Sequence, residues 1–238
     1  MNSGGPMSRP IGAFSRTSFL MTMHHSHSHG DVGRFDEWAP RYERHWMQRL
    51  IFGPIQSTLL DLAASQAPRP ASILDVGCGT GRLLRTASQR FPDAHLDGVD
   101  AAPQMVAQAI SLLPAGAPIH FQQATAEALP FADGQFDLVF STMTFHHWAD
   151  QKKGVSEVAR VLAPNGRWLL ADFVGRGIVR SITQLFRLHR FFDRKGLDAF
   201  IADAGLAVVT ERPSGWLGRS VPVLAIKKVE RAMGIEPT

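Results

Sequence analysis

Strand-like apolar runs alternate with helical patterns over most of this chain. A compact apolar run at 72–76 is followed by a helical pattern at 82–90, and the same order recurs further along. A strand, a helix and a second strand in this order form a right-handed crossover between parallel strands. The predicted strands are 72–76, 96–99, 118–122, 136–141, 167–173, 206–210 and 221–227, and the predicted helices between them are 82–90, 103–111, 153–162 and 197–204.

The last two predicted strands are separated by a loop alone, so they can pair antiparallel. The sequence therefore predicts an α/β fold, with a doubly wound, mostly parallel seven-stranded sheet and helices on both faces. An antiparallel hairpin forms its C-terminal edge. A length of 238 residues suffices for one such domain.

Composition divides the chain into one domain between two tails. The first 34 residues are rich in Gly, Ser, Pro and His and carry no acidic residue before Asp31, which is typical of a disordered tail. The domain is expected at 35–229 and consists of an N-terminal helical segment at 35–70, a core at 71–175, a basic amphipathic segment at 176–195, and a C-terminal helix and hairpin at 196–229, before a tail at 230–238.

Composition also excludes several classes of protein. With 45% hydrophobic and 19% charged residues, the chain is neither collagen-like, nor a coiled coil, nor wholly disordered. No apolar run approaches the roughly 18 to 20 residues that cross a bilayer, so stable membrane insertion is not expected, although the basic segment leaves peripheral contact open. A single cysteine, Cys78, cannot form an intrachain disulfide, which favours a reducing, cytoplasmic setting.

Three glycines at alternate positions follow the first predicted strand. Gly77, Gly79 and Gly81 allow a sharp turn and let a ligand approach main-chain N–H groups. In an open α/β sheet, the loops beyond the carboxyl ends of the strands form the ligand crevice. A dinucleotide fingerprint needs its third glycine where this chain has Arg82, so a pyrophosphate-binding oxidoreductase is disfavoured.

Several segments together resemble the class I S-adenosylmethionine-dependent methyltransferases, over residues 35–228. The acid-plus-glycine motif at 73–81, the second motif at 98–105 and the segments 124–131, 136–141 and 160–166 carry the resemblance. The segment 35–42 resembles the N-terminal segment of the subgroup that methylates small molecules, including quinone-ring methyltransferases. The resemblance implies S-adenosylmethionine as cofactor, S-adenosylhomocysteine as product, and O- or C-methylation of a small, apolar acceptor. It also implies that 35–70 is a lid, that 71–175 binds the cofactor and that 176–195 lies on the acceptor side.

The resemblance also implies a set of cofactor-binding residues. Asp100, at the end of the second strand, is expected to accept hydrogen bonds from the ribose hydroxyls, although it can also cap the following helix. Asp75 is expected to bind the amino group of the cofactor, while Cys78 packs without reacting. The full set is Tyr42, Asp75, Gly77, Cys78, Gly79, Gly81, Asp100, Ala101, Met105, Thr125, Ala126, Glu127 and Ser141.

Thr125 departs from the family pattern. Many members have Asp there, which binds the exocyclic amine of adenine, whereas a Thr hydroxyl is a weaker, neutral acceptor. Adenine recognition is then expected to rest on the backbone N–H of Ala126 and on packing by Ala101 and Met105, although Met105 fits an ordinary core position equally well. The sequence therefore predicts modest affinity for the cofactor.

His146 and His147 follow the fourth strand and are the candidate general base, with a purely structural role as the alternative. Trp38 and Tyr42 are expected in the lid that closes over the cofactor. No metal site is predicted, and no Asn/Asp-Pro-Pro-aromatic tetrapeptide indicates a nucleic-acid acceptor. A non-catalytic, cofactor-binding regulatory protein remains the alternative, and the chain is expected to be a monomer or a homodimer.

Overall fold

The computed structural model describes residues 52–173, 194–214 and 221–229. The elements are α2 (Gly53–Gln66), β1 (Ser72–Val76), α3 (Arg82–Arg90), β2 (His95–Asp100), α4 (Pro103–Ser111), β3 (Ile119–Gln123), β4 (Phe136–Thr142), the short 3₁₀ helix η2 (Phe145–His147), α5 (Gln151–Val161), β5 (Leu162–Ala171), α7 (Arg194–Asp203), β6 (Leu206–Pro213) and β7 (Pro222–Lys228). The two predicted tails, Trp38, Tyr42 and most of the basic segment lie outside these residues.

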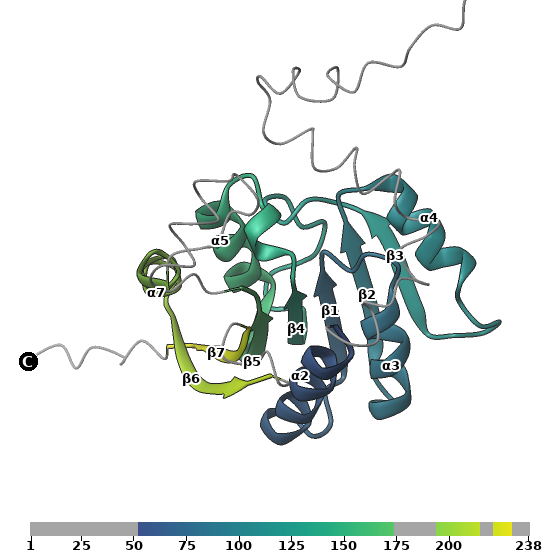
Figure 1. Ribbon diagram of the computed structural model, residues 1–238, viewed down its shortest axis with the longest axis horizontal. Coiled ribbons are helices and arrows are strands. Elements are labelled where there is room, and N and C mark those ends of the chain that lie inside the picture. The colour runs from purple at the N-terminus through teal and green to yellow at the C-terminus, as the bar shows by residue number, and fades with distance from the viewer. Residues whose placement is uncertain (1–51, 174–193, 215–220, 230–238) are drawn as a thin grey trace, which may run out of the picture.

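All seven strands form one sheet, in the order β3-β2-β1-β4-β5-β7-β6. The pairs from β3 to β5 are parallel, while β7 runs antiparallel to both β5 and β6. The strand order reverses beside β1, where β2 lies on one side and β4 on the other (Figure 1). The predicted fold class is confirmed, including the antiparallel C-terminal hairpin.

Helices cover both faces of the sheet, and each face has its own apolar core. On one face, buried side chains of α2 and α3 pack against β1, β4 and β5; on the other, α5 and α7 pack against the opposite sides of the same strands (Figure 1). Successive residues of β1 show the division, because Ile73 belongs to the first core and Leu74 to the second. Alternate side chains of a strand point to opposite faces, so a strand covered on both sides is apolar throughout.

Several predicted boundaries differ from the observed ones, and two of the differences have a clear local reason. Helix α5 begins at Gln151 instead of Lys153, because the Asp150 side chain accepts a hydrogen bond from Lys153 N at 3.0 Å and caps the helix. Strand β5 begins at Leu162, since Leu162 pairs with Phe136 before a register shift restores the ladder at Arg167. The chain thus enters the sheet five residues earlier than the apolar run alone suggests.

Helix α2 forms part of the core. Pro54 occupies its first turn, where no backbone N–H is required, and Leu59, Leu62 and Ala63 are fully buried against the sheet. The helix packs on β5 and β7, far along the sequence. Residues 53–66 are therefore packed into the core of the domain. The predicted lid is left to 35–51, which lie outside the described residues.

The described residues contain neither a membrane-spanning helix nor a cluster of metal ligands. No helix among them is both long and apolar enough to span a bilayer. Nor does the described part of the chain bring three or more His, Cys, Asp or Glu side chains together in a way that would hold a metal ion.

Candidate functional site

The glycine-rich loop between β1 and α3 is anchored to the end of β2. Gly77 N and Cys78 N both donate hydrogen bonds to Val99 O, at 2.8 and 2.9 Å. Gly79 N donates to Asp100 Oδ2 at 2.8 Å. The loop that should receive a ligand and the acid at the tip of the neighbouring strand are therefore joined directly, as their places in the sequence predict.

Gly77 and Gly81 are required by close packing as well as by their backbone conformation. Both have positive φ, +78° and +74°. A β-carbon at Gly77 would lie 2.0 Å from Thr144 Oγ1, and one at Gly81 would lie 2.3 Å from the Phe121 ring. Gly77 is thus the point at which the loop after β1 touches the loop after β4.

Asp100 serves two backbone segments at once. Its Oδ2 accepts from Gly79 N, and its Oδ1 accepts from Ala102 N at 2.9 Å, just before α4 begins. The N-cap residue of α4 is Ala102, which has no side-chain cap, so Asp100 holds the backbone before the helix instead of capping it. The contact of Asp100 with the ribose hydroxyls stays a prediction. The half-buried carboxylate is held in a fixed position at the carboxyl edge of the sheet.

Asp75 is a buried acid whose Oδ1 has no hydrogen-bond partner among the described residues. Its side chain is 2% exposed. Burial, reinforced by the negative charge of Asp100, raises the pKa of Asp75 to about 8. Burial also raises the pKa of the neighbouring Cys78 thiol well above its ordinary value, so this thiol is not an activated nucleophile.

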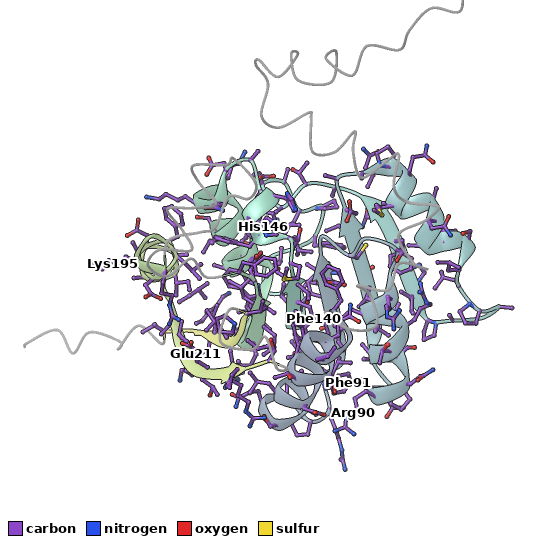
Figure 2. The ribbon with its side chains drawn as sticks, in the orientation of Figure 1. Arg90, Phe91, Phe140, His146, Lys195 and Glu211 are labelled. Carbon is purple, nitrogen blue, oxygen red and sulfur yellow. The ribbon has the colours of Figure 1, made fainter. Side chains whose placement is uncertain are left out.

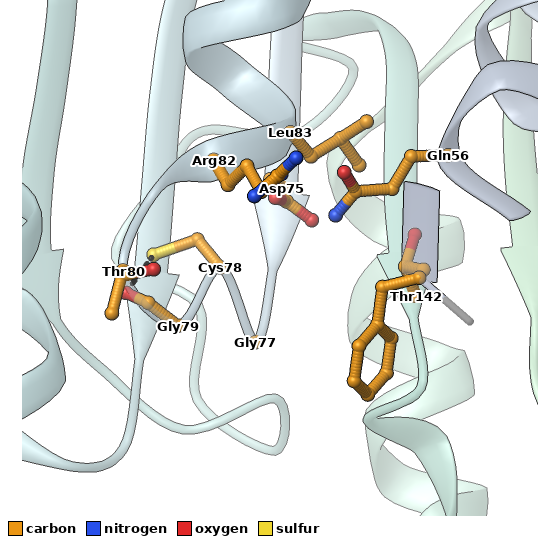
Figure 3. Close-up of a pocket in the computed structure, with 10 residues that line it drawn as sticks. Gln56, Asp75, Gly77, Cys78, Gly79, Thr80, Arg82, Leu83 and Thr142 are labelled. Atoms are coloured by element: carbon orange, nitrogen blue, oxygen red, sulfur yellow. Dashed lines mark hydrogen bonds between the residues drawn. The ribbon is translucent and has the colours of Figure 1, made fainter. Parts of the chain in front are cut away.

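Asp75 and the glycine-rich loop line a pocket at the carboxyl edge of the sheet (Figure 3). The cavity is small, with a volume of about 50 Å³. The lining residues are Phe52, Gln56, Asp75, Gly77, Cys78, Gly79, Thr80, Arg82, Leu83 and Thr142.

Two polar residues that line this pocket, Gln56 and Thr142, were not predicted from the sequence. Gln56 comes from α2, whose place beside the pocket depends on long-range packing that a local pattern does not show. Thr142 directly follows the predicted Ser141 in β4, and neighbouring strand residues point to opposite faces. A register assignment for β4 could have shown that Thr142 points into the pocket. Ser141 is fully buried, and its hydroxyl accepts a hydrogen bond from Trp168 Nε1 at 3.2 Å.

A buried His–Asp pair lies beyond the carboxyl ends of β4 and β5. His146 Nδ1 is 2.7 Å from Asp172 Oδ1, with side-chain exposures of 8% and 0%. His146 N also donates to Asp172 Oδ2, at 3.2 Å. Figure 2 shows His146 beyond the end of β4. His147 is exposed, and its ring centroid lies 3.9 Å from that of His146.

Comparison with known proteins agrees with this geometry. A family model described as a methyltransferase domain matches residues 73–166. This chain is 41% identical over 144 residues to demethylmenaquinone methyltransferase of Thermus thermophilus, covering 58% of this chain and 64% of that protein. Residues 73–166 therefore match a methyltransferase domain.

Two further relatives extend the comparison of this methyltransferase domain. The chain is 35% identical over 168 residues to malonyl-[acyl-carrier protein] O-methyltransferase of Geobacter sulfurreducens, covering 65% of this chain and 62% of that protein. The crystal structure of YcgJ from Bacillus subtilis superimposes with a TM-score of 0.61 at 26% identity, covering 74% of this chain and all of that one. The chain spans just under two thirds of the length of the two curated relatives.

Within the methyltransferase domain, the predicted cofactor residues fall into two groups. Asp75, Gly77, Cys78 and Gly79 line the pocket. Gly81, Asp100, Ala101, Met105, Thr125, Ala126, Glu127 and Ser141 are not among its lining residues, and their cofactor contacts stay predictions.

The second group consists of half-buried, buried and exposed positions around the same edge of the methyltransferase domain. Met105 and Ala126 are buried, whereas Thr125 is exposed. Glu127 Oε1 accepts a hydrogen bond from Asp150 N at 3.1 Å, which ties its loop to the start of α5. Glu127 therefore already has a structural role, in addition to the cofactor contact predicted for it.

Proposed function

We propose that this protein is an S-adenosylmethionine-dependent methyltransferase acting on a small, apolar acceptor. The observation that carries the proposal is the buried Asp75, whose Oδ1 lacks a partner in the described residues and which lines a pocket formed by the glycine-rich loop. A buried, unsatisfied carboxyl group is costly unless a ligand compensates for it. The amino group of S-adenosylmethionine is a cation of the required charge.

The residues present fit this cofactor. Asp100 is held at the tip of β2 by two backbone donors, and its carboxylate is the kind of acceptor that ribose hydroxyls require. Gly77 and Gly79 carry no side chain that would fill the pocket. When bound, the cofactor supplies a methyl carbon on a positively charged sulfonium, and its departure as a neutral thioether needs no acid. The protein's task is therefore alignment and exclusion of water.

His146 is the proposed base for an acceptor whose proton must leave. The contact between His146 Nδ1 and Asp172 places the ring proton on Nδ1, so Nε2 is the basic nitrogen. Thr144, two residues earlier, lies against Gly77, so this loop is continuous with the cofactor pocket. Asp172 then acts as a positioning residue, and exposed His147 remains the second candidate base.

Two curated relatives support a catalytic protein over the regulatory alternative, since both are named as methyltransferases. Their names refer to demethylmenaquinone and to O-methylation of a malonyl group on acyl-carrier protein. The first of these acceptors is a small, apolar molecule. We extend that class of acceptor to this chain. The proposed setting is the cytoplasm, where the single thiol stays reduced, and the proposed assembly is a monomer or a homodimer without nucleic acid.

Calorimetric titration with S-adenosylmethionine and S-adenosylhomocysteine tests the proposal. Asp100→Ala should abolish saturable binding, whereas Asp97→Ala, which removes a carboxylate three residues earlier in the same strand, should bind like the wild type. Absence of binding by the wild type would overturn the proposal. Transfer of a labelled methyl group to a panel of quinols and phenols then separates an enzyme from a regulatory protein that binds without turnover.

A further inference from the structure

Two buried polar atoms without a hydrogen-bond partner line the same pocket. Across the described residues, the buried side-chain atoms without partners are Asp75 Oδ1, Thr142 Oγ1 and Arg167 Nε. The first two belong to pocket-lining residues, whereas Arg167 does not line the pocket. Buried polar groups in folded proteins almost always have partners, so two such atoms in residues that line one pocket point to a polar ligand as their partner.

The backbone around Thr142 is fixed by its neighbours. Met143 has φ +57°, and among the described residues it is the one non-glycine residue with positive φ. Its N–H donates to Ala171 O at 2.8 Å, and the following Thr144 packs on Gly77. A non-glycine residue keeps such a conformation at a cost that the surrounding structure must offset. The end of β4 is therefore turned sharply, at the point where the Thr142 side chain faces the pocket.

Gln56 approaches the same space from α2. It stands in the first turn of this helix, next to Ile55, which is buried in the core. The side chains of Gln56 and Asp75 point toward one another, and Thr142 lies on the Gln56 side of the pocket (Figure 3). Three acceptor groups, a carboxylate, a hydroxyl and a side-chain amide, thus border one cavity from β1, β4 and α2.

We propose that Thr142 and Gln56 complete, with Asp75, a subsite that recognises the ammonium group at the amino-acid end of the ligand. An ammonium group has three N–H donors. The subsite offers three acceptors for them: the Asp75 carboxylate, the Thr142 hydroxyl and the Gln56 amide oxygen. The inference rests on the proposed function, because it assigns residues within that cofactor pocket. Thr142 and Gln56 are then specificity-determining residues. They should not increase the affinity for a nucleoside that lacks the amino-acid end.

Two ligands that differ in this end test the assignment. S-adenosylhomocysteine carries the ammonium group, whereas 5′-methylthioadenosine keeps the adenosine and the sulfur but has no amino-acid end. Calorimetric affinities are measured for the wild type, Thr142→Val, Thr142→Ser and Gln56→Met. Thr58→Val is the matched control. It removes the half-buried hydroxyl of Thr58 on α2, which donates to Pro54 O and belongs to a residue that does not line the pocket.

Loss of one hydrogen bond to a charged group weakens binding about ten-fold or more. Thr142→Val and Gln56→Met should therefore each lose about ten-fold in affinity for S-adenosylhomocysteine and less than two-fold for 5′-methylthioadenosine. Thr142→Ser should retain the wild-type preference between the two ligands. Thermal unfolding of each variant checks that it is folded.

The outcomes are distinct. Equal weakening of both ligands by Thr142→Val and Gln56→Met, or no weakening of either, would overturn the subsite while leaving the proposed function intact. If the wild type bound neither ligand, the proposed function would fail and the subsite with it. Weakening confined to S-adenosylhomocysteine supports the subsite.

Discussion

Asp75 and Asp100 are two carboxylates at the ends of adjacent parallel strands, and the charge of Asp100 adds to the effect of burial on Asp75. Together they raise the pKa of Asp75 from 3.8 to about 8. The unfolded chain releases this proton near the ordinary value, and the folded protein holds it until about pH 8. Between those limits the folded state binds more protons, so the free energy of unfolding falls as the pH rises.

The first prediction concerns this pH dependence. In the wild type, Asp75 should make the free energy of unfolding fall by up to about 1.4 kcal/mol per pH unit. Asp75→Asn should remove this pH dependence. Urea unfolding from pH 5 to pH 8 measures it, with the exposed Asp93→Asn as control. Identical slopes for Asp75→Asn and the wild type would contradict the assignment.

Ligand binding should release the same proton. Below pH 8 Asp75 is mainly protonated in the ligand-free protein, and a nearby ammonium group favours the ionised form. The affinity for S-adenosylhomocysteine should therefore rise with pH up to about 8. Calorimetry at pH 7 in buffers of different ionisation enthalpy should show release of up to one proton, and Asp75→Asn should show none.

Gly77→Ala should destabilise the protein more than Gly79→Ala. Both positions have positive φ, which costs a side-chain-bearing residue about 1 to 2 kcal/mol. The new methyl group at position 77 would also collide with Thr144, whereas nothing lies within 4 Å of one at position 79. Overpacking adds about 1 to 3 kcal/mol at position 77. Urea unfolding of both variants measures the difference, and equal losses would argue against a tight contact with Thr144.

Thr125→Asp should tighten binding of S-adenosylmethionine about five-fold, since a hydrogen bond to a charged acceptor is stronger than one to a hydroxyl. Thr125 is exposed, so the exchange buries no new charge. Thr125→Asn is the neutral control and should gain less. An unchanged or weakened affinity of Thr125→Asp, measured by calorimetry, would show that adenine is recognised elsewhere.

Replacement of the His–Asp pair should affect turnover more than cofactor affinity. On a hydroxylated acceptor, His146→Ala should lower kcat about 100-fold or more, and the double variant His146→Ala/His147→Ala should lower it at least as far. Asp172→Asn should also lower kcat, because an amide no longer stabilises a protonated His146. S-adenosylhomocysteine affinity should stay within about two-fold. Unchanged turnover would leave the pair with a structural role.

The sequence predicted elements whose signals are local. The bounds of β1, α3 and α4 coincide with the predicted ranges, because glycines or prolines mark their ends. The positions of Asp75 and Asp100 at the carboxyl ends of β1 and β2, and of the glycine-rich loop directly after β1, were also predicted from local signals.

The remaining site residues depend on contacts between distant segments. Gln56 reaches the pocket because α2 packs on strands far along the chain. Asp172 pairs with His146, 26 positions earlier, because β4 and β5 are neighbours. No local pattern contains these distances, so the sequence predicted His146 without its partner.

The position of β7 between β5 and β6 has a consequence for biosynthesis. Among the described strands, β6 pairs with β7 alone. During synthesis β6 leaves the ribosome before β7. The backbone N–H and C=O groups of β6 therefore have no partner strand until β7 has emerged. Closure of this side of the sheet therefore requires β7, and truncation before residue 222 would detach two strands.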